Sequence, residues 1–243
     1  MDRIVATLSI IIPCFNEAST LEAIVGRVID SPVSLKKEII LIDDGSTDES
    51  AAIIDRLPVK YRDRPDATIV IQRHPTNRGK GAAVRTALAR ASGDIILIQD
   101  ADLEYDPRDY AALLDPIRRG TTDVVYGTRR DSRPLSIREP RHWRFIAASR
   151  LVTTIANVLF GARLTDYATG YKVFTRRAAD RLALETSGFE VCAEMTAQFL
   201  KLGYPIVETP IRYQPRTVAE GKKIRAADGW RAIRTLLRER WER

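Results

Sequence analysis

The sequence is poor in the residues that form disulfides and metal clusters. Its 243 residues include two cysteines, Cys14 and Cys192, and two histidines, His74 and His142. The cysteines lie far apart without a C-x-x-C motif, so we expect neither a disulfide framework nor a zinc site. Long apolar runs are also missing. The uncharged stretch 151–162 is far shorter than the about 20 residues that a membrane-spanning helix needs.

Glycine and proline are few as well, and charge of one sign predominates. The 13 glycines and 12 prolines exclude collagen-like and long low-complexity segments. The N-terminal apolar run lacks a small-residue cleavage site, so we expect a cytoplasmic protein. The net charge is +7, and of 39 basic residues 8 are lysine and the rest arginine. Arginine binds phosphate in a bidentate fashion, which indicates phosphorylated ligands or an anionic membrane, although genomic base bias explains the composition equally well.

The first half alternates short apolar runs with helical segments. We expect strands at 7–13, 38–43, 67–72, 94–99 and 123–126. We expect helices at 17–28, 48–57, 81–91 and 107–118. Continuous apolar strands separated by helices are typical of a parallel sheet that is covered on both faces. The pattern therefore predicts an α/β, Rossmann-like, doubly wound fold.

The second half has a different pattern but no linker separates it from the first. Its expected elements are helices at 143–160, 191–202 and 228–243, a strand-like segment at 206–213 and a basic loop at 221–226. We expect a single domain, 1–243. Residues 1–130 form its nucleotide and metal half, and residues 131–243 form its acceptor half with a C-terminal amphipathic helix.

Acidic and polar residues gather where the expected strands end. They occupy 13–17, 43–48, 99–104 and 127–130. In an open parallel sheet, ligands bind beyond the carboxyl ends of the strands. Helix capping explains any one acidic strand end, but not four together. The pattern therefore indicates a ligand site at this edge of the sheet.

Asp100 and Asp102 are the strongest candidates for metal ligands. Two carboxylates at positions i and i+2 of an extended end can approach one point, and they repel unless a cation lies between them. Hard oxygen ligands favour Mg²⁺ or Mn²⁺. A D-x-D motif alone is weak, and its place at a strand end strengthens it.

The glycine-rich turn 77–81, N-R-G-K-G, precedes an expected helix and can cradle phosphate there. The turn is not a P-loop, because G-x-x-x-x-G-K-[ST] is missing. It also lacks the third glycine of the dinucleotide fingerprint and lies on the third unit, not the first. These differences make NAD binding and P-loop ATPase activity improbable. No nucleic-acid recognition motif accompanies the basic charge, so we expect no nucleic-acid partner.

The motifs PCFNE, DDGSTD, NRGKG, QDADLEYDP and VVYGTR resemble, in this order and spacing, the family 2 glycosyltransferases of the GT-A fold. The later segments LTDYATGYKVF, FEVCAEMTAQFLKLGY and PRTVAEGKKIRAADGWRA resemble the dolichyl-phosphate mannose synthase and polyprenyl-phosphate sugar transferase branch. The resemblance covers most of the chain. It implies inverting transfer of a sugar from a GDP- or UDP-sugar to a polyprenyl or dolichyl phosphate, with Mg²⁺ or Mn²⁺. Relatives often carry C-terminal membrane spans, and this sequence contains none.

Together with these patterns, the resemblance implies a role for each matching residue. The residues assigned to the nucleotide or donor are Pro13, Phe15, Glu17, Asp44, Gly79, Lys80, Asp100, Ala101, Arg216 and Lys222. Those assigned to the metal are Asp100, Asp102 and Glu104. Those assigned to catalysis are Asp102, Arg129 (against phosphate) and Glu194. Phe15 replaces the more usual tyrosine, and Glu104 stands where dolichyl-phosphate mannose synthases tend to have glutamine.

Three other functions remain open. Transfer to a hydroxyl of a soluble or polymeric acceptor needs a base, for which Glu194 is the candidate, although the helix dipole alone explains an acid in a first turn. A metal-dependent phosphohydrolase usually has a nucleophilic aspartate on its first strand, where this chain has PCFNE. A non-catalytic nucleotide-binding module needs no such complete set of metal and phosphate groups. A phosphate acceptor is already ionised at neutral pH and needs no base.

Two segments are suited to a membrane surface. Residues 145–160 carry few charges, and Trp230, Ile233, Leu237 and Trp241 lie at helical spacing among arginines. Aromatic residues beside a basic face favour the interface of an anionic membrane. We therefore expect peripheral contact with the cytoplasmic face of the membrane. A C-terminal helix that packs on the domain with a solvated arginine face explains the pattern as well.

Overall fold

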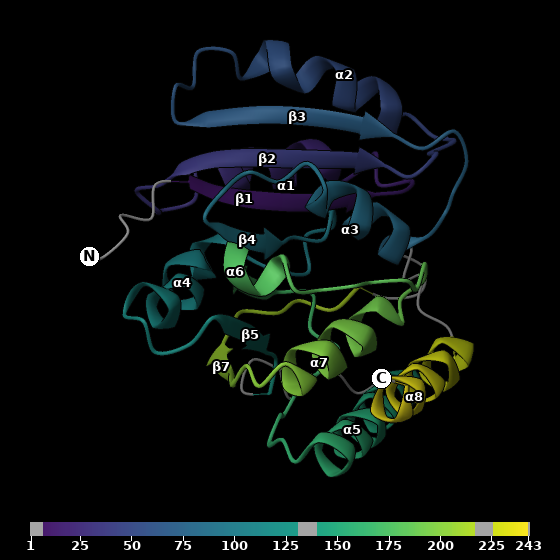
Figure 1. Ribbon diagram of the computed structural model, residues 1–243. Coiled ribbons are helices and arrows are strands. Elements are labelled where there is room, and N and C mark those ends of the chain that lie inside the picture. The colour runs from purple at the N-terminus through teal and green to yellow at the C-terminus, as the bar shows by residue number, and fades with distance from the viewer. Residues whose placement is uncertain (1–6, 131–139, 217–225, 243) are drawn as a thin grey trace.

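A seven-stranded sheet runs through the molecule (Figure 1). The computed structural model describes residues 7–130, 140–216 and 226–242. The strands are β1 (Thr7–Cys14), β2 (Lys36–Asp43), β3 (Ala67–Arg73), β4 (Ile95–Ile98), β5 (Val124–Thr128), β6 (Lys172–Thr175) and β7 (Ile206–Pro210). The helices are α1 (Leu21–Ile29), α2 (Ser50–Lys60), α3 (Lys80–Leu88), α4 (Tyr110–Arg118), α5 (Pro140–Phe160), α6 (Arg176–Ala179), α7 (Val191–Lys201) and α8 (Ala226–Trp241), and a 3₁₀ turn, η1 (Pro107–Asp109), precedes α4.

The sheet is mostly parallel, as the alternation of strands and helices predicts. The strand order is β3-β2-β1-β4-β6-β5-β7. The exception is β6, which pairs antiparallel with both β4 and β5 and separates them. The sequence reading missed this strand, because a run of four residues after a polar loop carries too little periodicity to be recognised. The second half of the chain therefore contributes β6 and β7 to the sheet that the first half begins.

Two apolar layers cover the faces of the sheet. Leu8, Ile10 and Ile12 of β1 point to the face that α1, α2 and α4 cover. Ile11 points to the opposite face, beneath α3 and α7. Successive side chains of a strand alternate between faces, and a strand that is buried on both sides must be apolar throughout. This explains the continuous isoleucine run of β1.

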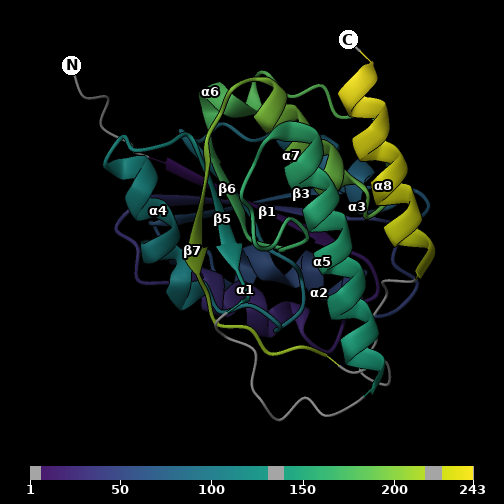
Figure 2. The ribbon, with the colours of Figure 1, turned by 90° about the horizontal axis from the view of Figure 1, so that it is seen from below.

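The helices α5 and α8 lie side by side beyond α7 (Figures 1 and 2). A third apolar cluster joins the three helices, and its buried members are Val152, Ala156, Tyr167, Ala193, Ala197, Ala232 and Leu236. The C-terminal helix therefore packs on the domain along one face. Within the parts of the chain that the structure describes, no helix has both the length and the apolar composition to cross a membrane.

Candidate active site

Several of the expected site residues gather at the carboxyl edge of β1, β2 and β4. Parallel pairing aligns Cys14 with Asp43, and Ile11 with Ile98, so the segments that follow these strands leave the sheet together. Their carboxylates form the group that we call the carboxylate cluster, which consists of Glu17, Asp100, Asp102 and Glu104. This edge is where ligands bind in an open parallel sheet.

Arg216 joins three members of the carboxylate cluster. Its Nη1 donates to Glu17 Oε2 at 2.8 Å, and its Nη2 donates to Asp102 Oδ2 at 2.6 Å. Its backbone N–H donates to Glu104 Oε1 at 2.8 Å. The structure thus brings together four residues that the sequence assigned to donor or metal binding, from segments that are up to 199 positions apart.

The carboxylate cluster concentrates negative charge in a buried place. Burial, and then the neighbouring charges of Asp100 and Glu104, raise the pKa of Asp102 to about 7, although Arg216 opposes the shift. Burial also acts to lower the pKa of Lys80, but its pairing with Asp100 outweighs burial and raises that pKa above the usual range. Positive charge therefore stabilises this site, and Lys80 and Arg216 provide it.

The donor set fits a hard divalent cation. Asp100 and Asp102 offer carboxylate oxygens at one strand end, and such oxygens favour Mg²⁺ or Mn²⁺. The raised pKa of Asp102 shows that one more positive charge would stabilise its ionised form. In the described part of the chain, no three His, Cys, Asp or Glu residues converge in a ready-made metal cage.

A glycine lets the loop 165–170 approach Asp100. A Cβ on Gly170 would lie 2.4 Å from Asp100 Oδ2, so any larger residue there displaces the carboxylate. The Gly170 N–H donates to the Tyr105 hydroxyl at 2.9 Å. The buried Lys172 Nζ holds the same loop by donating to the carbonyls of Tyr167 at 2.9 Å and Thr169 at 2.7 Å.

We expect Gly170→Ala to weaken the binding of a nucleotide diphosphate with Mn²⁺ by about tenfold, because overpacking costs about 1–3 kcal/mol at a close contact. Isothermal titration calorimetry measures the change. Gly229→Ala is the matched control, because a Cβ on Gly229 meets no atom within 4 Å. Equal affinities for the wild type and Gly170→Ala would show that Asp100 takes no part in binding.

Asp44 organises the glycine-rich turn. Its Oδ1 accepts hydrogen bonds from the Arg78 N–H at 2.9 Å and from His74 Nδ1 at 2.6 Å. Its Oδ2 accepts from the Gly79 N–H at 2.7 Å. The backbone and the imidazole therefore engage both carboxylate oxygens of Asp44, a residue that the sequence assigned to the nucleotide. His74 was not singled out from the sequence, because its partner lies on a different strand end.

Two backbone donors at the end of the glycine-rich turn have partners within the chain. The Ser187 carbonyl accepts hydrogen bonds from the Gly81 N–H at 2.7 Å and from the Ala82 N–H at 3.2 Å. Since the chain itself fills these donors, they are closed to a phosphate. Gly79 has a φ of 92°, and a Cβ on it would lie 2.4 Å from the Ser187 carbonyl oxygen. The glycines thus let loop 185–188 approach the turn, and the phosphate role of the turn stays a prediction.

Arg129 forms a buried ion pair that the sequence did not reveal. Its Nε lies 2.6 Å from Asp166 Oδ2, and its Nη2 lies 2.7 Å from Asp166 Oδ1. Its Nη1 points to the Tyr105 hydroxyl at 3.4 Å, and its guanidinium stacks over the Tyr213 ring at 5.1 Å. Burial acts to raise the pKa of Asp166, but Arg129 holds it below the usual value. The guanidinium is therefore charged and fixed in direction.

The other predicted residues lie at the edge of this site or outside the description. Pro13 and Phe15 are half-buried at the end of β1, beside β2. Ala101 is buried, and its carbonyl accepts from the Thr20 hydroxyl at 2.9 Å. Lys222 lies outside the described residues. The assignment of these residues to the nucleotide stays a prediction.

Glu194 is fully buried in the first turn of α7. Its carboxylate accepts hydrogen bonds from the N–H groups of Glu185 at 2.8 Å and Thr186 at 3.1 Å. It also accepts from Arg238 Nη2 at 3.3 Å. These contacts join α7 to loop 185–186 and to α8, and none of them supports the predicted role as a base.

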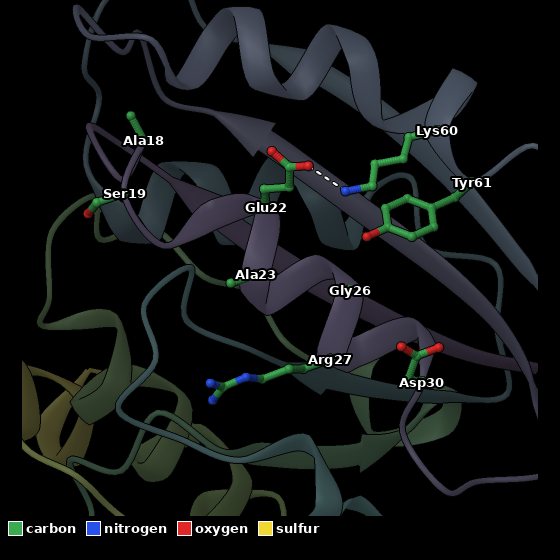
Figure 3. Close-up of a pocket in the computed structure, with 9 residues that line it drawn as sticks. All are labelled: Ala18, Ser19, Glu22, Ala23, Gly26, Arg27, Asp30, Lys60 and Tyr61. Carbon is green, nitrogen blue, oxygen red and sulfur yellow. Dashed lines mark hydrogen bonds and ion pairs between the residues drawn. The ribbon is translucent and has the colours of Figure 1, made fainter.

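A shallow depression lies on the outer face of α1 (Figure 3). It has a volume of about 560 Å³, and its lining includes Glu22, Arg27 and Tyr61. Lys60 pairs with Glu22 across it. No member of the carboxylate cluster lines this depression, so it is separate from the site described above.

Comparison with known proteins agrees with this fold. Glucosyl-3-phosphoglycerate synthase from Mycobacterium tuberculosis, in complex with uridine diphosphate, superposes with a TM-score of 0.69 at 21% identity, over 97% of this chain and 80% of that chain. The likeness confirms the expected GT-A-like fold.

Two relatives are similar in sequence over most of this chain. It is 28% identical over 242 residues to the undecaprenyl-phosphate mannosyltransferase of Micrococcus luteus, covering 96% of this chain and 95% of that protein. It is 30% identical over 238 residues to a low-salt glycan biosynthesis hexosyltransferase of Haloferax volcanii, and spans only 54% of the length of that protein. The sequence profile described as glycosyl transferase family 2 matches residues 9–183. The chain therefore belongs to glycosyl transferase family 2.

Proposed function

We propose that this chain transfers a sugar, with inversion, from a nucleotide diphosphate to a polyprenyl phosphate. The observation that carries the proposal is the carboxylate cluster, which meets Lys80 and Arg216 at the carboxyl edge of the sheet. A bound diphosphate is negative and its metal ion is positive. Lys80 and Arg216 complement the charge of the diphosphate, and the carboxylates complement the charge of the metal. The undecaprenyl-phosphate mannosyltransferase of Micrococcus luteus supports the acceptor class.

Asp100 and Asp102 would hold the metal, with Glu104 as a further candidate ligand. The glucosyl-3-phosphoglycerate synthase was also solved with Mn²⁺ and UDP-glucose, which supports Mg²⁺ or Mn²⁺ in this chain. Such a metal neutralises charge that develops on a leaving diphosphate. Lys80 and Arg216 add positive charge at the same place, where burial strengthens their effect.

Arg129 would hold the acceptor phosphate. The pairing with Asp166 fixes the guanidinium, so it orients a phosphate without losing side-chain freedom at the moment of binding. A phosphate oxygen then attacks the anomeric carbon from the face opposite the diphosphate. The bond from that carbon to the diphosphate oxygen breaks, and its electron pair leaves with the nucleoside diphosphate.

The surroundings of Glu194 favour a phosphate acceptor over a hydroxyl. A hydroxyl needs a base, whereas a phosphate is ionised at neutral pH because its second pKa is about 6. Glu194, the candidate base, is enclosed by loop 185–186 and α8. Without a base, the reaction depends on cationic groups that position the donor diphosphate and the acceptor phosphate.

An acceptor panel tests the proposal and its alternatives. A set of GDP- and UDP-sugars is incubated with a short polyprenyl phosphate, the matching polyprenol, or soluble sugars, in Mg²⁺ or Mn²⁺. We expect transfer to the polyprenyl phosphate alone. Faster transfer to a hydroxyl would favour the second glycosyltransferase reading. Donor cleavage without any acceptor would indicate a phosphohydrolase, and nucleotide binding without turnover would indicate a binding module.

We propose that the outer faces of α5 and α8 contact the membrane that carries the acceptor. Trp230 is 75% exposed and Trp241 is 69% exposed on α8, and Leu151 and Val158 are exposed on the adjacent α5. Exposed Arg234 lies between the two tryptophans. Aromatic residues with arginine suit the interface of an anionic membrane, so the packed helix is not only a structural element.

Replacing both Trp230 and Trp241 by serine is expected to weaken binding to anionic vesicles by about tenfold or more, because their aromatic area no longer enters the interface. Vesicle sedimentation measures the change, and nucleotide binding should stay constant. Val59→Ser is the control, because Val59 is 67% exposed on α2, at the opposite end of the molecule from α8 (Figure 1). Undiminished vesicle binding by the double variant would remove the membrane role of α8.

A further inference from the structure

A buried carboxylate joins three segments behind the carboxylate cluster. Glu194 Oε1 accepts from the Glu185 N–H and from Arg238 Nη2, and its Oε2 accepts from the N–H and the hydroxyl of Thr186. A buried charge is stable only where hydrogen bonds replace its lost hydration. Glu194 therefore holds loop 185–188 and α8 in one fixed arrangement.

Loop 185–188 in turn holds the beginning of α3. Its Ser187 carbonyl accepts from the N–H groups of Gly81 and Ala82. Arg85 Nη1 donates back to the Glu185 carbonyl at 2.6 Å and also to the Thr186 carbonyl. A Cβ on Gly81 would lie 2.4 Å from the Thr186 carbonyl oxygen. Because backbone meets backbone at these contacts, a displaced loop must move the start of the helix.

The start of α3 carries Lys80, which pairs with Asp100 of the carboxylate cluster. A series of contacts thus runs from Arg238 on α8, through Glu194 and loop 185–188, to the start of α3, where Lys80 pairs with Asp100. The first contact in this series lies on the helix that exposes Trp230 and Trp241.

We propose that Glu194, together with Arg238, is a positioning residue that sets the place of Lys80 beside Asp100 and so preorganises the donor site. The ligand in this statement, a nucleoside diphosphate with its metal, rests on the proposed function. The role differs from that of a base, because Glu194 acts through loop 185–188 and touches neither the donor nor the acceptor. It also explains a buried acid that the transfer chemistry does not use.

Glu194→Gln and Arg238→Gln test the role from both ends of the ion pair. At position 194, glutamine keeps one acceptor oxygen but loses the negative charge and the second acceptor oxygen. Arg238 is part-exposed, and glutamine at position 238 still offers an amide N–H group toward Glu194, so this variant gives a second, independent test. Lys201→Gln is the matched control, because it removes the ion pair of Lys201 with Glu239, at 3.1 Å, between the same two helices without touching loop 185–188.

Two measurements are made on the full chain. Calorimetry gives the dissociation constants of GDP and UDP with Mn²⁺, and amide hydrogen exchange without nucleotide reports on the N–H groups of Gly81 and Ala82. We expect both glutamine variants to bind the preferred nucleotide about tenfold more weakly, the scale of one lost hydrogen bond to a charged group. Exchange should speed up at Gly81 and Ala82 as well as at Glu185 and Thr186. Lys201→Gln should match the wild type in both measurements, and Arg238→Lys should recover part of the affinity.

The outcomes separate this inference from the proposed function. Faster exchange at Glu185 and Thr186 with unchanged exchange at Gly81 and Ala82 would overturn the inference. So would unchanged nucleotide affinity in Glu194→Gln together with a lost rate and an altered pH profile, because that result identifies a base. If the wild type binds neither nucleotide, the proposed function fails, and the exchange at Gly81 and Ala82 still decides whether Glu194 positions α3.

Discussion

Asp102→Asn is expected to lower the rate of sugar transfer by about two orders of magnitude or more, the scale of losing one key electrostatic group. Asp102 is buried beside Asp100 and Glu104, and it pairs with Arg216 at 2.6 Å. Asparagine keeps the shape of the side chain but lacks the charge that would hold the metal. Rates are measured in Mg²⁺ and in Mn²⁺ over a range of concentrations.

The expected change in the thermal stability of Asp102→Asn separates a loss of catalysis from a loss of folding. Burial, and then the charges of Asp100 and Glu104, raise the folded-state pKa of Asp102 to about 7. Since this lies above the unfolded value of about 3.9, the ionised carboxylate destabilises the metal-free protein as the pH rises from about 4 to 7. Without metal, at about pH 8, Asp102→Asn should therefore melt no lower than the wild type.

A second aspartate nearby provides the control. Asp106 caps η1 by accepting from the Arg108 N–H at 3.0 Å, outside the carboxylate cluster. Asp106→Asn should keep the wild-type rate and metal requirement, because asparagine caps nearly as well as aspartate. A wild-type rate for Asp102→Asn in both metals would remove Asp102 from the metal site.

Arg129→Lys is expected to reduce kcat/KM for polyprenyl phosphate by about tenfold or more, while nucleotide diphosphate affinity stays unchanged. Lysine keeps the positive charge but cannot form the two parallel bonds that Asp166 receives from Nε and Nη2. The charge then no longer points in one direction, and the acceptor phosphate loses its partner. The conservative substitution is preferred to alanine, which would strand Asp166 in a buried place and cost about 3–5 kcal/mol.

Steady-state kinetics with varied acceptor, and calorimetry with varied nucleotide, separate the two substrates. Arg177→Lys is the control, because Arg177 pairs with Asp123 at an exposed position. A loss that appears in nucleotide affinity instead of acceptor kinetics would place Arg129 on the donor side. Unchanged kinetics would leave the Arg129 and Asp166 pair a purely structural one.

The first half of the fold follows closely from local pattern. The apolar run of β1 and the helical spacing of α1 each appear in the structure within a few residues of the expected positions. β1 is buried along most of its length and α1 is buried along one face, so the core that they join sets their apolar residues. The strand β6 was missed because it is short and its place between β4 and β5 depends on contacts with distant segments.

The candidate site shows the same division. Asp100 and Asp102 were identifiable because their spacing and their place after a strand are local features. Asp166 and His74 were not identifiable, because the contact that singles each of them out is with a partner at least 30 positions away. The glycine-rich turn was identified as a special backbone, but its contact with loop 185–188 could not be foreseen, because that loop lies about 100 positions away in the chain, and its phosphate role stays a prediction.

The sequence by itself determined the alternation of strands and helices, and it predicted the edge of the sheet for the candidate site and the carboxylates that would hold a metal. It could do so because burial imposes a period on the chain and motifs are contiguous. Only the tertiary structure decided that Ser187 closes the turn at Gly81, that Asp166 fixes Arg129, and that Glu194 binds loop 185–188 and α8. The reason is that a polar atom bonds to the partner that folding brings close to it. That partner lies on a distant segment, and the local sequence pattern of neither segment indicates the contact.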